Sequence, residues 1–161
     1  MPKVSVIMGT YNGAKTVDSA LQSICDQTFT DWEFIICDDC STDDTLEHLR
    51  RWKRKDNRIK VIKNKKNSRL AYSLNHCLSV ATGEYIVRMD DDDISYPERI
   101  NTLVTFLDKN PDYAFAGSLV ECFDGNQTIN GQRMYRKEQP KKRDFLSTSP
   151  FVHPTVMFRR E

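Results

Sequence analysis

The chain has 161 residues, 39% of them hydrophobic, and a formal net charge of +1 at neutral pH. That length and apolar content predict a single globular domain over residues 1–161 with a core of its own. No stretch approaches the roughly eighteen uninterrupted apolar residues of a membrane-spanning helix, and the first residues lack the order of a signal peptide, so we expect a cytoplasmic protein.

The first predicted element is a buried strand over residues 3–8, because this run is apolar and a turn follows it directly. The turn, GTYNG, contains Thr10 and Tyr11 and is typical of a tight loop. After Thr16, which can cap a helix, apolar residues recur at helical spacing over residues 17–25. We therefore predict a strand, a polar loop and a helix that buries one face.

A second strand is predicted over residues 32–37, and it runs into an acidic loop that begins with Asp38 and Asp39. The short polar side chains of this loop suit the start of a second helix, which carries Leu46 and Leu49. The second loop of the chain is therefore polar like the first, and it is acidic.

Basic residues are concentrated in two stretches of the chain. Residues 50–69 carry eleven Lys or Arg residues and one acid, and a second basic stretch covers residues 133–143. Such a patch can bind nucleic acid, an anionic membrane or a phosphorylated substrate. A solvated helix face is the commoner cause of a charge run, and we favour it while leaving the binding alternatives open.

A third strand is predicted over residues 59–62, followed by the clearest helix in the sequence. An apolar stripe at helical spacing runs from Leu70 and Ala71 to Ala81, with polar residues on the other face, and Gly83 ends the helix. We expect this stripe to pack against the sheet.

A fourth strand, residues 85–89, ends abruptly in four consecutive aspartates, which we call the acid run: Asp90, Asp91, Asp92 and Asp93. Pro97 then opens a helix that extends to Leu107. Further strands are predicted over residues 113–120 and 151–158.

Alternation of strands and helices over the first 110 residues predicts an α/β fold with a mainly parallel, Rossmann-like sheet flanked by helices on both faces. In such sheets ligands bind beyond the carboxyl ends of the strands. The loops with Thr10, with Asp38 and with the acid run all follow such ends. We therefore expect these three loops to converge in space.

Four adjacent carboxylates repel one another, so an ionised acid run next to a second acidic loop calls for a cation or for full exposure to water. Oxygen ligands without His or Cys favour Mg²⁺ or Mn²⁺, ions that proteins often hold with one or two carboxylates plus substrate phosphates. The acid run therefore predicts a divalent metal and a phosphorylated ligand. An acidic surface turn that binds nothing is the alternative.

Several motifs in order resemble those of glycosyltransferase family 2. They are VSVIMGTYN at residues 4–12, FIICDDCSTD at 34–43, residues 67–75, ATGEYI at 81–86, RMDDDDI at 88–94 with Pro97, and HPTVMFR at 153–159. The resemblance covers nearly the whole chain. It implies a GT-A fold and an inverting enzyme that binds a nucleotide-diphospho-sugar, typically a UDP-sugar.

By position in these motifs, Thr10 and Tyr11 resemble nucleotide contacts, and Asp39, with Asp38 beside it, resembles the aspartate that hydrogen-bonds the base. The Asp90-x-Asp92 pattern resembles the family's DxD element. This resemblance implies that Asp92 is the first metal ligand and that Asp90 and Asp91 lie nearer the ribose and sugar, with Asp90 as a second metal ligand. Cys40 stands where the family has Gly, so the turn after Asp39 departs from the family's pattern.

The implied reaction is attack of an acceptor hydroxyl on the anomeric carbon, with Mn²⁺ or Mg²⁺ stabilising the departing nucleoside diphosphate. Such a reaction needs a general base, which in this family lies beyond the segment that matches residues 153–160. We therefore expect the base beyond Glu161, in a longer protein of which this chain is a truncated part. His153 is either on the acceptor side or structural.

The partners expected from the resemblance are a UDP-sugar donor and a saccharide or lipid-linked acceptor in polysaccharide or glycolipid synthesis. A lipid-linked acceptor would bring the protein to the inner face of a membrane through residues 50–69. The enzymatic alternative is a metal-dependent nucleotidyltransferase. The non-catalytic alternative is a nucleic-acid-binding module, which the acidic loops disfavour, so no nucleic acid is expected.

Overall fold

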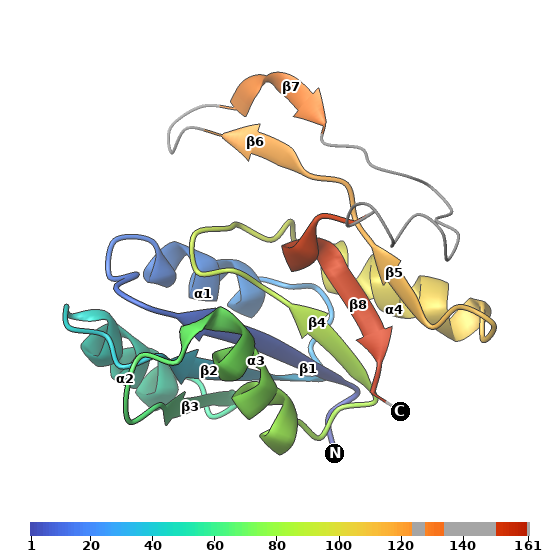
Figure 1. Cartoon of the computed structure of the whole chain (residues 1–161). Coiled ribbons are helices and arrows are strands. Elements are labelled where there is room, and N and C mark those ends of the chain that lie inside the picture. The colour runs from blue at the N-terminus through green and yellow to red at the C-terminus, as the bar shows by residue number, and fades with distance from the viewer. Residues whose placement is uncertain (124–127, 134–150, 161) are drawn as a thin grey trace.

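The computed structural model of the chain describes residues 1–123, 128–133 and 151–160. Its main sheet has six strands, and the first four of them are parallel to one another (Figure 1). The strands are β1 (Val4–Thr10), β2 (Trp32–Asp38), β3 (Ile59–Lys63), β4 (Tyr85–Arg88), β5 (Phe115–Gly117) and β8 (Val156–Arg159), in the order β3-β2-β1-β4-β8-β5.

Among the described strands of the main sheet, β8 alone runs opposite to the others. β8 is antiparallel to both β4 and β5, so β5 runs in the same direction as β4. The predicted mainly parallel sheet is thus confirmed. A separate two-stranded sheet, β6 (Glu121–Phe123) with β7 (Thr128–Arg133), follows β5 and was not predicted from the sequence.

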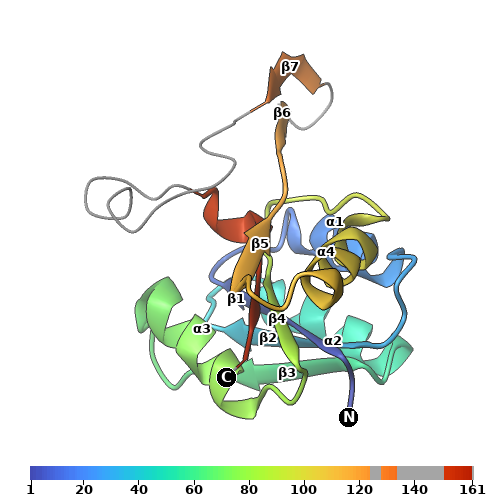
Figure 2. The same cartoon turned by 90° about the vertical axis from the view of Figure 1, so that its right-hand side faces the viewer.

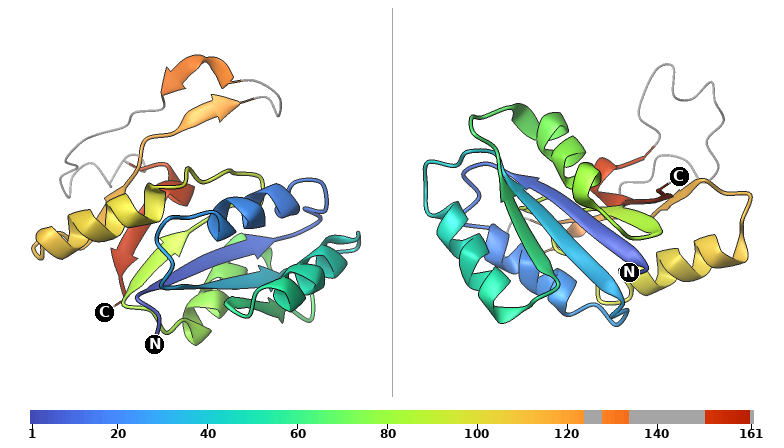
Figure 3. Two further views of the ribbon diagram at one scale, coloured as in Figure 1. Left: turned by 180° about the vertical axis from the view of Figure 1, so that it is seen from behind. Right: turned by 90° about the horizontal axis from the view of Figure 1, so that it is seen from below.

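Helices cover both faces of the sheet (Figures 2 and 3). One face carries α1 (Val17–Cys25), α2 (Thr45–Lys55) and α4 (Arg99–Lys109), and the other carries α3 (Arg69–Val80). A short 3₁₀ helix, η2 (His153–Thr155), precedes β8. Among the described residues, no helix is long and apolar enough to cross a membrane.

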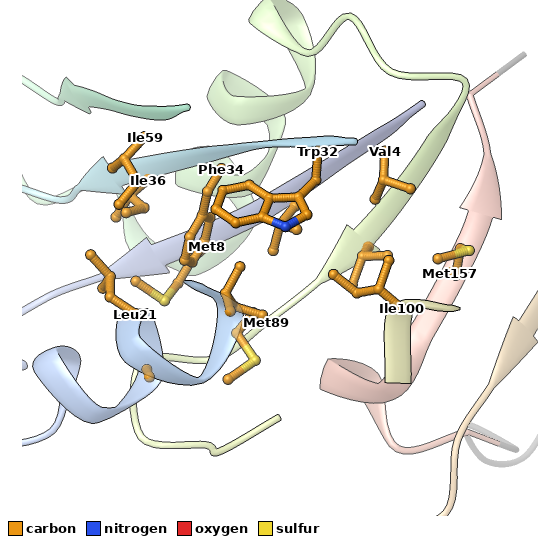
Figure 4. Packing of buried hydrophobic residues seen from close by; sticks show 14 of the residues in the cluster. Val4, Met8, Leu21, Trp32, Phe34, Ile36, Ile59, Met89, Ile100 and Met157 are labelled. Carbon is orange, nitrogen blue, oxygen red and sulfur yellow. The ribbon is translucent and has the colours of Figure 1, made fainter. Parts of the chain in front are cut away.

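Alternating side chains of the central strand build two cores. Val4 and Met8 of β1 point to the face of α1 and α4, where they join Leu21 and Ile100 in the larger cluster (Figure 4). Ile7 points to the other face and packs with the smaller cluster under α3. Burial of one such side chain contributes about 1.5–3 kcal/mol, so both faces of β1 help to fix its register.

The apolar stripe predicted for α3 packs against the sheet from Leu74 to Ala81, as expected, but its first turn does not. Leu70 and Ala71 are exposed, whereas Ser73 and Cys77 are the buried positions of the helix. These two residues are four apart and lie on one side of the helix, so the buried stripe starts a turn later than hydrophobicity alone predicts. The strand predicted over residues 113–120 is shorter than expected, since only β5 (Phe115–Gly117) forms there.

Candidate functional site

The candidate site lies at the carboxyl edge of the sheet, where β1, β2 and β4 end. Thr10 and Asp38 are register partners at the last positions of β1 and β2, and Arg88 closes β4. Because these strands are parallel, the loops that follow them leave the sheet at the same edge (Figure 1). The predicted convergence of the three loops is confirmed.

The loop after β1 touches the acid run directly. The Thr10 hydroxyl donates a short hydrogen bond to the Asp91 carboxylate. Gly13 faces this pair, because a Cβ at that position would lie 2.8 Å from Thr10 Oγ1 and 3.1 Å from Asp91 Cγ. A side chain at residue 13 would therefore push the loop away from Asp91, and the absence of one keeps the first and third loops together.

The loop after β1 is also joined to the loop after β2. Asn12 N donates to Ser41 Oγ at 3.0 Å, and Thr42 N donates to Asn12 Oδ1 at 2.9 Å. Ala14 N adds a bond of 3.3 Å to Asp43 Oδ2. These bonds make the first loop a bridge between the acidic loop and the acid run.

Asp39 lies in the loop after β2, and its buried carboxylate contacts the start of α3. Its carboxylate accepts hydrogen bonds from Asn64 Nδ2 at 2.7 Å, from Ser68 N at 2.9 Å and from Arg69 N at 2.7 Å. Burial alone would raise the pKa of Asp39, but these bonds outweigh it and lower the pKa below its ordinary value. Asp39 is therefore an ionised anchor for residues 64–69.

Asp38 is completely buried, and its two oxygens have different surroundings. Oδ1 accepts a bond from Ser41 N at 3.2 Å. Oδ2 has no hydrogen-bond partner within the described part of the chain, and Lys63 Nζ lies 3.8 Å away. Asp38 holds the turn after β2, whereas Tyr11, a predicted nucleotide contact in the loop after β1, is exposed.

Three carboxyl groups of the acid run resist ionisation. Burial raises the pKa values of Asp90, Asp91 and Asp93, and the charge of Asp92 raises each of them further. Three contacts lower these pKa values: the charge of Arg88 at Asp90, the hydrogen bond from Thr10 at Asp91, and the charges of Arg99 and Arg88 at Asp93. They do not cancel the rise. When it is ionised, the acid run would therefore carry negative charge that its own neighbours compensate only in part.

The side chains of the acid run fit a divalent ion only in part. Asp92 is exposed and Asp90 is half-buried, and both offer the carboxylate oxygens that Mg²⁺ and Mn²⁺ prefer. Within the described residues, no group of three His, Cys, Asp or Glu side chains is arranged to hold a metal on its own. The protein can thus supply one or two ligands, and the remaining ligands would come from a phosphorylated substrate and water.

Two arginines at the acid run were missed as site residues. Arg88 Nη2 donates to both oxygens of Asp90, at 2.8 and 3.1 Å. Arg99 donates to the carbonyl oxygens of Arg88 and Pro154 and is buried deeply enough that its pKa falls to about 10. An isolated Arg near a loop carries no distinctive sequence signal, so only the fold reveals that both cations face the acid run.

The second half of the chain brings one more predicted residue to the site. His153 lies close enough to Asp90 to lower the pKa of that carboxyl by its charge. Several residues of the first basic stretch are ion-paired: Arg51 of α2 with Asp18 at 3.7 Å, and Arg58, after the helix, with Asp56 at 2.6 Å. Most of the second basic stretch, together with Glu161, lies outside the described residues.

An α/β sheet with three joined polar loops at its carboxyl edge belongs to a class of proteins that bind their ligands at this edge. The sequence pattern of the family "Glycosyl transferase family 2" matches residues 5–161. The chain therefore belongs to glycosyl transferase family 2.

Named relatives agree with this assignment. EpsE of Bacillus subtilis, named as a glycosyltransferase, is 45% identical over 159 residues that cover 98% of this chain and 56% of EpsE. The GalNAc(5)-diNAcBac-PP-undecaprenol beta-1,3-glucosyltransferase of Campylobacter jejuni is 32% identical over 149 residues, which cover 91% of this chain and 48% of that protein. The chain thus spans about half the length of these relatives.

A solved structure shows the same fold. Residues 1–349 of TarS from S. aureus, in complex with UDP-GlcNAc, superpose with a TM-score of 0.79 at 26% identity, over 98% of this chain and 45% of that one. The predicted GT-A fold and glycosyltransferase family are thereby confirmed, and the nucleotidyltransferase and nucleic-acid-binding alternatives are set aside. The roles predicted for individual site residues stay predictions.

Proposed function

We propose that this chain forms the donor-binding part of an inverting glycosyltransferase that transfers a sugar from a UDP-sugar to an acceptor hydroxyl. The observation that carries the proposal is the hydrogen-bonded junction of the three loops, in which Thr10 ties the first loop to Asp91 while Asn12 ties it to the acidic loop. A diphosphate beside the acid run and a base near Asp39 would together span this junction. UDP as the nucleotide is supported by the likeness to TarS with UDP-GlcNAc.

A divalent ion, Mn²⁺ or Mg²⁺, belongs to this proposal, with Asp92 as its first ligand and Asp90 as its second. Bound there, the ion would offset the charge that builds up on the leaving nucleoside diphosphate. Three features of the acid run support it: the chemistry of its oxygens, the exposure of Asp92 and the raised pKa values of the other three carboxyls. Arg88 orients Asp90, and Thr10 orients Asp91.

The nucleotide contacts of the proposal are Thr10, Tyr11, Asp38, Asp39, Asp90 and Asp91. Tyr11 is exposed and available to a base or ribose. Asp39 already accepts three backbone or side-chain donors, so its main contribution is to position residues 64–69 as a wall beside the base. A hydrogen bond donated by the base to Asp39 would use the same carboxylate oxygens that already accept bonds from residues 64–69.

The acceptor of the proposed reaction is a saccharide or a lipid-linked saccharide in polysaccharide or glycolipid synthesis. The printed name of the Campylobacter jejuni relative, with its undecaprenol-linked substrate, supports the lipid-linked case. The general base is proposed to lie beyond Glu161. A longer protein that contains this chain would then bring the base to the acceptor side of the site, near His153.

Calorimetric titration of the folded chain with UDP, in buffers with Mn²⁺ and with EDTA, tests the donor site. We expect saturable binding with Mn²⁺ that weakens strongly in EDTA, because the ion joins the diphosphate to the acid run. GDP serves as the matched nucleotide and should bind more weakly than UDP. Absence of UDP binding in Mn²⁺ by a sample with a cooperative thermal transition would contradict the proposal.

A further inference from the structure

A cavity of about 640 Å³ adjoins the acid run on the side away from β2. Its walls come from residues 93–99, from the first turns of α4, from residues 117–123 and from η2. The size is within the range of about 300–1,000 Å³ that ligand pockets occupy. Because β5 runs in the direction of β4, residues 117–119 leave the sheet at the same edge as the acid run.

The cavity has an apolar floor and an apolar mouth. Met89 and Leu103 are buried at its base. At its mouth, Ile94 is 56% exposed and Leu119 is 55% exposed, and Phe123 is also exposed. Exposure of several large apolar side chains around one cavity is costly in water and marks a surface that a ligand covers.

The charged groups of the cavity carry a negative balance. Among the described residues that line it, Asp93, Glu98 and Glu121 are acidic and Arg99 is the single base, so three negative charges face one positive charge. The Glu121 carboxylate accepts a bond of 2.7 Å from the Tyr96 hydroxyl, which fixes it at the rim. This balance disfavours an anion, and the apolar lining disfavours any ion because of the cost of desolvation.

Arg99 holds one wall of the cavity together. Its guanidinium donates to the carbonyl oxygens of Arg88 and Pro154, which joins the end of β4 to η2. Its Nε is buried and has no hydrogen-bond partner within the described part of the chain. Burial of this Nε without a partner among the described residues costs about 1–3 kcal/mol, which the two bonds of the guanidinium help to offset while they fix the wall of the cavity.

We propose that this cavity binds an uncharged acceptor saccharide, with an apolar face of the sugar or an apolar substituent against Met89, Leu103 and Leu119, and that its acidic rim excludes acidic sugars. The inference rests on the proposed function, because the donor sugar beside the acid run would then meet the acceptor where the two sites share Asp93. Hydroxyl groups of such an acceptor would face Glu98 and Glu121 at the rim.

A matched set of 4-nitrophenyl glycosides tests this proposal by NMR titration of the chain with UDP and Mg²⁺ present, because Mg²⁺ is diamagnetic and leaves the resonances beside the acid run visible. The neutral probes are the β-glucoside, β-galactoside and the two N-acetylhexosaminides, and the acidic probe is the β-glucuronide, which differs from the glucoside only at C6. We expect at least one neutral probe to shift the resonances of residues 94–103 and 117–121. The glucuronide should bind about fivefold or more weakly, from the repulsion of one added charge near the rim.

Two variants locate the binding. Leu119→Asp should weaken the neutral probe at least about fivefold by placing a charge at the apolar mouth, whereas Val80→Asp, at another exposed apolar position on α3, should leave it unchanged. The double variant Glu98→Gln with Glu121→Gln should bring glucuronide binding close to that of the glucoside.

Three results would overturn the proposal: no shift with any of the four neutral probes, equal binding of glucuronide and glucoside by the unmodified chain, or equal effects of Leu119→Asp and Val80→Asp. UDP binding is measured in the same samples by calorimetry. Retained UDP binding with no glycoside binding would reject the acceptor cavity alone, and loss of both would reject the proposed function.

Discussion

Three non-glycine residues adopt left-handed backbone within the described part of the chain: two lie in the loops after β1 and β2, and the third is the first residue of α3. They are Asn12 with φ 56°, Cys40 with φ 64° and Arg69 with φ 69°. Asn is tolerant of this conformation, whereas a side chain such as Cys pays about 1–2 kcal/mol for it. The conformation of Cys40 fits the turn in which the family has Gly.

Cys40→Gly is therefore expected to stabilise the chain. Relief of the left-handed strain exceeds the added backbone entropy of the unfolded state, so the free energy of unfolding should rise by about 0.5–1 kcal/mol. Urea denaturation measures this change in the free energy of unfolding. Ser41→Gly is the control, because Ser41 is not among the left-handed residues and its replacement by Gly should destabilise the chain. Equal destabilisation by both changes would contradict strain at Cys40.

Glu33 is a buried acid at the edge of the sheet opposite the site. Its carboxylate accepts bonds of 2.7 Å from Ser5 Oγ and from Thr82 N, and Lys60 Nζ lies 2.5 Å away. Burial alone would raise the pKa of Glu33, but these partners outweigh it and lower the pKa from 4.5 to about 2. Glu33 thus links β1, β2, β3 and the turn before β4.

Glu33→Gln should destabilise the chain by about 3 kcal/mol at neutral pH, since a lowered pKa stabilises the state in which the carboxylate is ionised. This contribution is complete above about pH 4.5 and is lost as the pH falls through about 2. The free energies of unfolding of Glu33→Gln and of the unmodified chain should therefore become more similar in acid. Denaturation at pH 7, 4 and 3 measures it. The exposed Glu84→Gln is the control, and a pH-independent difference would contradict the account.

At the scale of elements, Gln27 joins α1 to the segment that follows the acid run. Its side-chain nitrogen donates to Tyr96 O at 2.8 Å and to Ser95 Oγ at 3.2 Å, and its oxygen accepts from Ile100 N at 3.0 Å. The side chain is buried. One glutamine thereby fixes the turn between the acid run and α4.

Gln27→Ala should lower the free energy of unfolding by about 2–3 kcal/mol, because it leaves buried backbone groups without partners. Hydrogen exchange should show faster exchange of the Ile100 amide and its neighbours than of the amides of β1. Gln22→Ala, which removes one exposed bond to Asp26, is the matched control. Uniform loss of protection over the whole chain would contradict a local role for Gln27.

Hydrophobic periodicity predicted the elements of the first 110 residues well, because each has a regular apolar pattern that a strand or helix must bury. The four parallel strands and α4 fall where the sequence places them. The pattern failed at the first turn of α3, where Leu70 and Ala71 are exposed, and it did not predict that Ser73 Oγ accepts from Asn64. Beyond residue 110 it predicted a strand near β8 but not the pairing of β8 with β4. Long-range pairing of this kind leaves no local signal.

At the scale of the whole molecule, the position of the site was predictable because three polar loops follow parallel strands. The contacts within it were not, since Gly13 faces Asp91 and Arg99 donates to Pro154, which are both distant in the sequence. The fold divides its carboxyl edge into two regions. The proposed donor lies over β1 and β2, the proposed acceptor lies between β4 and β5, and the acid run separates them.

The central claim is that the acid run holds a divalent ion together with a nucleoside diphosphate. Electron paramagnetic resonance of Mn²⁺ measures uptake of the ion directly, with UDP present and with a protein-free UDP sample subtracted. We predict UDP-dependent uptake by the chain, near-complete loss of it in Asp92→Asn, and unchanged uptake in Asp112→Asn, which alters an exposed acid in the turn after α4. Equal uptake by Asp92→Asn and the unmodified chain would contradict the account.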